Sequence, residues 1–178
     1  KITNFLEEVW KDFRKSKKED FTNSPDTGYD EKRLIQLAKK INYLPEGKKY
    51  FRKILKLFDD RLAMLESDKL DWAMGELLAY ATLLKDGYSV RISGQDVERG
   101  TFSHRHAVVK TEDDEEEVIP LSLVSEDQGR FDIYNSFLSE YAVLGFDYGY
   151  SFNTPKGLTI WEAQFGDFFN GAQIIIDQ

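Results

Sequence analysis

The chain has 178 residues, of which 41% are hydrophobic and 14% aromatic, so it can bury the core of one globular domain. It contains no cysteine, which excludes disulfides, thiolate metal sites and cysteine nucleophiles and favours a reducing compartment, the cytoplasm. Its net charge of -8 disfavours nucleic acid as a partner, and its apolar stretches are too short to span a membrane.

The first 66 residues predict a helical lead-in segment, because their apolar side chains recur at helical spacing. A first amphipathic helix is predicted over residues 2–13. Asp30 can cap a second helix that ends near Pro45, and a longer third helix is predicted over residues 50–65.

From residue 67 onward, helical and strand patterns alternate. In chain order we predict a helix at 72–84, a strand at 88–93, short strands at 106–110 and 118–121, a strand at 131–135, a helix at 139–152, a buried strand at 158–165 and a helix from 166. This order predicts an α/β fold with a mainly parallel sheet and helices on both faces. The acidic run at 112–117 indicates a solvated turn rather than an acidic docking site.

Ligands of parallel α/β sheets bind where strands end, so the loops after residues 93, 135 and 163 are the places to search for a site. Glu140 lies in the first turn of a predicted helix with an apolar body. It can simply complement the helix dipole, or it can be a buried acid that shares a proton with a ligand nitrogen.

The chain has two histidines, His104 and His106, separated by Arg105. On a strand, the two imidazoles would share one face and Arg105 would point to the other. They could bind an anionic carboxylate, steer protons or form structural hydrogen bonds. A metal site would need further ligands, and without cysteine or more histidine we predict none.

Two other segments are ambiguous from the residues alone. The glycines at 94 and 100 have a spacing that fits neither a dinucleotide-binding fingerprint nor a phosphate-binding loop. Residues 161–168 pass from a strand into a helix through a polar, aromatic corner, which can belong to the core or hold a heterocyclic ring. These patterns predict an α/β domain with a polar rim and no particular reaction.

Four segments in order carry a family likeness: LDWA at 70–73, RISGQDVERGTFSHRH at 91–106, LSEYAVLGF at 138–146 and WEAQFGDF at 161–168. Together they resemble the decarboxylating, thiamine-diphosphate-dependent component of the 2-oxoglutarate dehydrogenase complex. The resemblance implies that residues 67–178 form a transketolase-like pyrimidine-binding domain, truncated at its C-terminus, after the lead-in of residues 1–66. In that family the cofactor lies between this domain and a second domain of the partner subunit, which implies a homodimer.

The resemblance also implies roles for individual residues. Glu140 matches the acid that bonds the aminopyrimidine of thiamine diphosphate and so activates the cofactor. Phe168 matches the aromatic residue that stacks on the aminopyrimidine, Gln164 lies in the adjoining corner, and Gln95 lies in the cofactor-proximal loop. His106, and after it His104, match an active-site wall that holds the substrate.

By this resemblance, the intact protein decarboxylates 2-oxoglutarate in the tricarboxylic acid cycle and passes the succinyl group to a lipoyl-bearing succinyltransferase. The family binds diphosphate and Mg²⁺ through a Gly-Asp-Gly motif that this chain lacks, so the metal is expected in a domain outside it, and the chain alone is expected to be inactive. A relative that prefers 2-oxoadipate, a non-catalytic acidic interaction module and a hydrolase with zinc on His104 and His106 are the alternatives.

Overall fold

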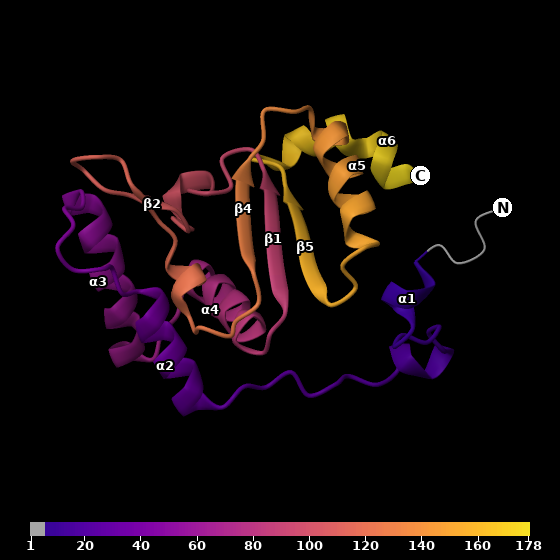
Figure 1. Ribbon diagram of the computed structural model, residues 1–178, viewed down its shortest axis with the longest axis horizontal. Coiled ribbons are helices and arrows are strands. Elements are labelled where there is room, and N and C mark those ends of the chain that lie inside the picture. Colours follow the sequence, from indigo (N-terminus) through magenta and orange to yellow (C-terminus); the bar gives the residue numbers. More distant parts are fainter. Residues whose placement is uncertain (1–5) are drawn as a thin grey trace.

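A parallel sheet of three strands lies at the centre of the computed structural model, which describes residues 6–178 except the side chains of residues 167 and 168 (Figure 1). The strand β1 (Ser89–Gly94) is in the middle, between β4 (Phe131–Asn135) and β5 (Gly157–Glu162). The helices are α1 (Glu7–Trp10), α2 (Glu31–Ile41), α3 (Arg52–Ser67), α4 (Trp72–Lys85), α5 (Glu140–Ser151) and α6 (Gln173–Asp177). The 3-10 helices are η1 (Lys18–Phe21), η2 (Thr101–Ser103), η3 (Pro120–Leu123) and η4 (Gly166–Ala172).

Helices cover both faces of this sheet, as the alternating pattern predicts. Successive residues of a strand point to opposite faces. Val90 and Ile92 of β1 are fully buried in the core that α4 shares with the sheet. Arg91 and Ser93 point to the other face, where both donate hydrogen bonds to Asp147 of α5. The predicted α/β fold is therefore confirmed.

The second helix of the lead-in segment begins where the sequence places its cap. Asp30 accepts a hydrogen bond from the main-chain nitrogen of Arg33 at 2.9 Å and starts α2. Leu37 and Ile41 of α2 are buried in the same core as α4. Figure 1 shows α2 and α3 together on the α4 side of the molecule. The lead-in helices thus extend the main core.

The first predicted helix is wrong in length. Residues 1–5 lie outside the described part, and α1 is a single turn. Val9, Trp10 and Phe13 remain exposed, so the turn lacks the packing that stabilises most short helices. Its main link to the domain is a hydrogen bond of 2.7 Å from the Trp10 indole to the carbonyl of Phe152.

The two short strands around the acidic turn are also shorter than predicted. They are β2 (Val109–Lys110) and β3 (Glu117–Val118), which pair antiparallel in a separate hairpin. Proline at position 120 ends β3 and starts η3, so residues 118–121 do not form one strand. The acidic turn between them is exposed as predicted, and Lys49 lies 3.3 Å from Glu112 and 3.4 Å from Asp113.

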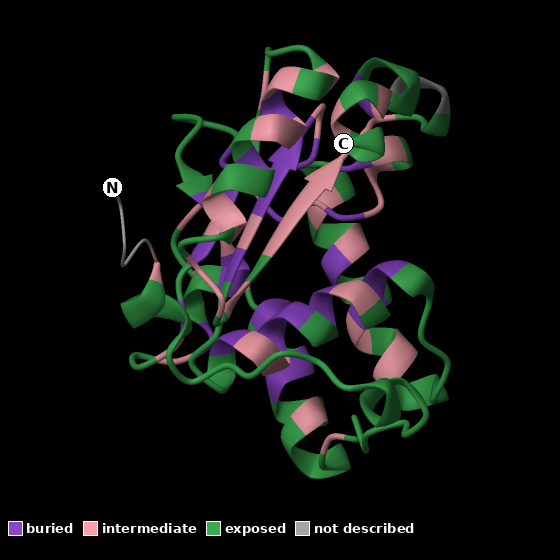
Figure 2. Cartoon of the chain, turned by 90° about the vertical axis from the view of Figure 1, so that its right-hand side faces the viewer, coloured by how far each residue is buried: buried purple, intermediate pink, exposed green. Residues whose placement is uncertain are grey.

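Burial falls from the centre of the sheet to its β5 edge. Figure 2 shows β1 largely buried, whereas β5 is mostly half-exposed. The prediction of a buried strand at 158–165 is wrong in burial and in length. Among the described strands β5 pairs with β1 alone, so it lies at an edge of the sheet, and it ends at Glu162. The helix predicted from residue 166 begins as η4 and becomes α6 only at Gln173.

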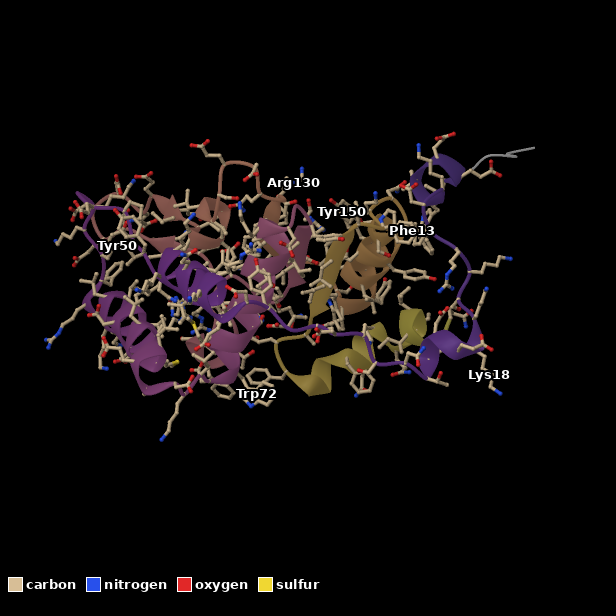
Figure 3. The ribbon with its side chains drawn as sticks, turned by 90° about the horizontal axis from the view of Figure 1, so that it is seen from below. Phe13, Lys18, Tyr50, Trp72, Arg130 and Tyr150 are labelled. Carbon is tan, nitrogen blue, oxygen red and sulfur yellow. The ribbon has the colours of Figure 1, made fainter. Side chains whose placement is uncertain are left out.

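Two surface features complete the fold. The side chain of Trp72, at the start of α4, points outward and is 94% exposed (Figure 3). Among the described residues, none of the helices has the length and apolar character needed to cross a bilayer.

Candidate functional site

The segments that follow the three parallel strands meet at one edge of the sheet, where α/β proteins bind ligands. β1 leads into residues 95–108, β4 into the start of α5, and β5 into η4. The main-chain nitrogen of Ser136 donates to the carbonyl of Gly94 at 2.7 Å, which joins the first two of these segments. We therefore treat this edge as the candidate site.

Glu140 and Gln95 contact each other directly at this edge. Glu140 is the first residue of α5, and its Oε1 accepts a hydrogen bond of 2.8 Å from the Gln95 amide nitrogen. Both side chains are half-buried. The structure thus brings together two predicted site residues that lie 45 positions apart in the sequence.

Two glycines make room for this pair. A Cβ atom on Gly94 would lie 2.0 Å from the carbonyl oxygen of Glu162, so only glycine lets β1 approach β5 so closely just before Gln95. A Cβ atom on Gly171, in η4, would lie 2.6 Å from Oε2 of Glu140. The second carboxylate oxygen therefore lies against bare backbone, and any larger residue at 171 would displace it.

Thr101 connects two further predicted residues, His104 and Gln164. Its hydroxyl donates to the carbonyl of Gln164 at 2.6 Å, and its own carbonyl accepts a hydrogen bond of 2.6 Å from Nδ1 of His104. Because a carbonyl can only accept, Nδ1 carries the proton. Nε2 of His104 lies 3.5 Å from a carboxylate oxygen of Glu76. Thr101 carries no signal of this role in the sequence.

The expectation that His104 and His106 share one face of a strand is wrong. His104 ends the η2 turn, and the following residues run irregularly until β2. Phe102, Ser103 and His106 all have positive φ angles, of 59°, 60° and 40°. Non-glycine residues in this region are strained and concentrate at functional sites.

Arg105 does not lie on the opposite face of a strand from the two histidines; it is a buried residue at the centre of two ion pairs. It is 2% exposed and donates hydrogen bonds to Glu76 of α4 at 2.8 Å, to the carbonyl of Val97 at 2.8 Å, and to Glu162 at the end of β5. Burial lowers the pKa of Arg105, but its bonds to Glu162 and Glu76 outweigh this and hold the pKa above its ordinary value. Arg105 thereby fastens its loop to the sheet and to α4.

His106 faces a different part of the edge from Glu140. It lines a cavity of about 290 Å³ with Glu98 and Asn135 and with apolar side chains that include Phe51 and Ile54. Burial lowers the pKa of His106 below its ordinary value, and the positive charges of Arg61 and Arg99 lower it further. His106 is therefore neutral at pH 7 and can accept a proton.

The aromatic corner after β5 is described only in part. The side chain of Phe168 lies outside the described residues. The rings of Phe102 and Phe165 meet edge-on, with centroids 6.4 Å apart, and Phe102 is 90% exposed. This places an aromatic pair beside the Thr101–Gln164 link.

Asp147 is a functional candidate that the sequence reasoning missed. It lies two helical turns after Glu140, on the same side of α5, and is 2% exposed. It accepts hydrogen bonds from Arg91 at 3.0 Å and from Ser93, which anchors α5 to β1. The seven-residue spacing from Glu140 is the signal that could have found it.

Within the described part of the chain, no group of three or more histidine, cysteine, aspartate or glutamate side chains is placed to hold a metal ion.

Comparison with known proteins gives a consistent result. A family model described as "Transketolase, pyrimidine binding domain" matches residues 68–178. The chain is 49% identical over 160 residues, 89% of its length, to the 2-oxoglutarate dehydrogenase E1 component of Haemophilus influenzae. It is 48% identical over 176 residues, 98% of its length, to the mitochondrial 2-oxoglutarate dehydrogenase of Caenorhabditis elegans. It is 50% identical over 159 residues, 89% of its length, to the E1 component of Azotobacter vinelandii. The chain spans 17% of the length of each of these relatives.

Proposed function

Because this chain belongs to the transketolase pyrimidine-binding domain family, we propose that it is the part of a 2-oxoglutarate dehydrogenase that binds the pyrimidine ring of thiamine diphosphate. Membership in the family implies dependence on that cofactor. The names of the relatives support 2-oxoglutarate as the substrate of the intact protein. We propose a lipoyl-bearing succinyltransferase as the acceptor of its succinyl group. We assign the domain to residues 67–178 and the helical lead-in to residues 1–66.

The contact between Gln95 and Glu140 carries this proposal, because it holds the carboxyl group in a fixed plane, as a hydrogen bond to a nitrogen of the aminopyrimidine ring requires. Gln95 occupies Oε1 and so fixes the plane of the carboxyl group, while Oε2 lies beside Gly171. A carboxyl group held in this way can share a proton with a ring nitrogen. Gln164 and Phe168 are proposed to border and stack on the same ring. When bound, the cofactor supplies the electron sink for decarboxylation.

We assign different tasks to the two histidines. His106 is uncharged at neutral pH, so it can hold or move a proton near the substrate and donate a hydrogen bond to it. His104 uses Nδ1 to hold the Thr101 carbonyl, which favours a positioning role for it. Exclusion of water from this edge would fall to the aromatic pair Phe102 and Phe165.

The diphosphate and Mg²⁺ are proposed to bind a different domain of the full-length protein. The family's Gly-Asp-Gly motif does not occur in this sequence. We therefore expect the chain alone to bind thiamine diphosphate weakly and to show no turnover.

A homodimer of the full-length protein is proposed from the surface around α5. Large apolar side chains before and along this helix are exposed: Phe137, Leu138, Tyr141, Phe146 and Tyr148. Exposed apolar side chains in such numbers mark interaction surfaces, and a second copy would bury them beside Glu140. Light scattering of the full-length protein should give twice the mass of one chain.

We propose the cytoplasm as the compartment of the protein. The absence of cysteine favours a reducing compartment such as the cytoplasm. The name of the Caenorhabditis elegans relative assigns that protein to the mitochondrion.

The decisive experiment replaces Glu140 by glutamine in the full-length protein. We expect Glu140→Gln to lower kcat at least about 100-fold, because glutamine cannot share the proton. The control is Glu126→Gln, which changes an exposed carboxylate far from the sheet edge. A non-catalytic module would be unaffected by either change. Rates with 2-oxoglutarate and 2-oxoadipate, measured on the same preparation, separate the two substrate preferences.

A further inference from the structure

Arg61 of α3 reaches the segment that carries the two histidines. It is 2% exposed, and its guanidinium donates hydrogen bonds to two successive carbonyls, of His104 at 2.9 Å and of Arg105 at 2.6 Å. These are the two peptide groups that directly precede His106. Arg61 lies outside residues 68–178, which match the family domain, so it belongs to the helical lead-in.

Packing alone does not explain why a charged side chain occupies the position of Arg61. Its guanidinium lies 5.4 Å from the ring of the buried Phe58 and forms no ion pair within 4.0 Å in the described part of the chain, so Asp71 and Glu76 act on its charge only from a longer distance. Burial lowers the pKa of Arg61 to about 10. A buried charge of this kind costs stability, and an apolar side chain of the same volume would often stabilise a core more.

The backbone of the segment that Arg61 holds is strained at His106. His106 has a φ angle of 40°, which a non-glycine residue adopts only when its surroundings impose it. On one side, Arg105 is fixed by Glu76 and Glu162, and on the other, the main-chain nitrogen of His106 donates to the carbonyl of Arg99 at 2.9 Å. Arg61 holds the carbonyls of the two peptide groups on either side of Arg105.

Further contacts tie the lead-in to the chain just after His106. Phe58 of α3 and Tyr50 share a small core with Val109 and Val118 of the β2–β3 hairpin. The main-chain nitrogen of Glu112 donates to the carbonyl of Lys49 at 2.8 Å. The lead-in therefore contacts the chain both before and after His106.

We propose that Arg61 is a positioning residue for His106, through which the helical lead-in sets the geometry of the active site. The proposal rests on the proposed function, since it gives His106 a task in the reaction. It makes the lead-in a working part of the site rather than a spacer before the domain.

The charge of Arg61 also affects the pKa of His106, and a side chain that only packs against the segment would not have this effect. The charged and titratable groups that face His106 are Arg61 from α3, Asp96, Arg99 and His104 from its own loop, and Glu98 and Lys110 across the cavity. Removal of the positive charge of Arg61 raises the pKa of His106. The limb of the pH–rate profile that His106 governs must then move to higher pH.

The test uses three variants of the full-length enzyme. Arg61→Met keeps the length of the side chain but removes its charge and donors, Arg61→Lys keeps the charge, and Arg52→Met changes an exposed arginine of the same helix. The measurements are kcat, KM, the pH profile, thiamine diphosphate affinity and the unfolding midpoint.

We expect Arg61→Met to lower kcat about 10- to 100-fold, as a small misplacement of a reacting group does, with cofactor affinity retained and the pH limb moved upward. Arg61→Lys should restore the position of the limb and part of kcat, and Arg52→Met should match the unchanged enzyme. Unchanged kinetics in Arg61→Met would overturn the proposal, as would a loss of kcat without movement of the limb.

If Arg61→Met does not fold, Arg61→Lys decides, because a lysine donates to fewer acceptors in this geometry. A lowered kcat with an unchanged unfolding midpoint then supports the proposal, and a full rate refutes it. Glu140→Gln separates the two ideas. If that variant abolishes turnover while the Arg61 series shows no change, only this inference fails, and if it leaves turnover intact, the proposed function fails.

Discussion

Asp147 on α5 and Arg91 on β1 form an ion pair with an Nε to Oδ1 distance of 3.0 Å, in which the carboxylate is buried and the guanidinium is partly buried. The guanidinium of Arg91 also lies over three rings, those of Tyr134, Phe146 and Tyr150, at 5.0 to 5.5 Å from their centroids. Since Asp147 lies two turns from Glu140, this pair sets the position of the helix that presents the proposed proton-sharing carboxyl group.

Replacement of Asp147 by asparagine should destabilise the chain. The change leaves the partly buried guanidinium of Arg91 without its counter-charge, and we expect a loss of about 1–3 kcal/mol in the free energy of unfolding. Chemical denaturation measures this. The control is Asp59→Asn, because Asp59 is exposed on α3. Equal stability of the two variants would show that Asp147 does not anchor α5.

Replacement of Gln95 by leucine removes the donor to Glu140 and leaves the fold intact. A hydrogen bond to a charged group contributes about 1.5–3 kcal/mol, so kcat of the full-length enzyme should fall about 10- to 100-fold. Steady-state kinetics provide the measurement, and Gln36→Leu, on the exposed side of α2, is the matched control. A Gln95→Leu enzyme with full kcat would mean that Gln95 does not orient the carboxyl group.

Replacement of Gly171 by alanine tests the room beside Oε2 of Glu140. The new Cβ would lie 2.6 Å from that oxygen, so the carboxyl group must move, and binding of thiamine diphosphate should weaken. Gly75→Ala is the control, since a Cβ there meets nothing within 4 Å. Gly75 lies in the first turn of α4, where the new methyl group has room, so this variant should keep the cofactor affinity of the unchanged enzyme. Titration of the cofactor against both full-length variants gives the comparison.

His106 should make the stability of the chain dependent on pH. Its folded-state pKa lies below the unfolded value of 6.5. At pH values between these two pKa values, the folded state therefore binds fewer protons than the unfolded state. Its contribution is therefore complete above about pH 6.5 and is lost as pH falls through the folded pKa. Denaturation of the chain and of His106→Asn between about pH 8 and about pH 5 isolates this part. Parallel curves for the two proteins would contradict it.

The local features of the fold are predictable from neighbouring residues, and the long-range ones are not. Asp30 and the apolar stripe after it predict α2, and the pattern at 88–93 predicts β1, because each depends on residues a few positions apart. The buried ion pairs of Arg105 could not be predicted from neighbouring residues, because its partners, Glu76 and Glu162, lie 29 and 57 positions away. Charged residues are rarely buried unless they are paired, and the sequence does not show which distant residues form such pairs.

The candidate site shows the same division. The residues alone left Glu140 as either a helix-dipole complement or a proton-sharing acid, and the family likeness selected the second. Its contact with Gln95 follows from the junction of β1 and α5, which the alternating pattern predicts only in outline. Thr101 and Arg61 act through main-chain carbonyls, which any sequence supplies, so no residue pattern could have pointed to them.

The half-exposed strand β5 has a consequence for handling the chain. It is joined to β1 along one side, and among the described strands nothing pairs with its other side. Free N–H and C=O groups along a strand edge recruit further strands from other molecules. At high concentration the separate 178-residue chain should therefore self-associate edge to edge, and short peptides that mimic a neighbouring strand should suppress this.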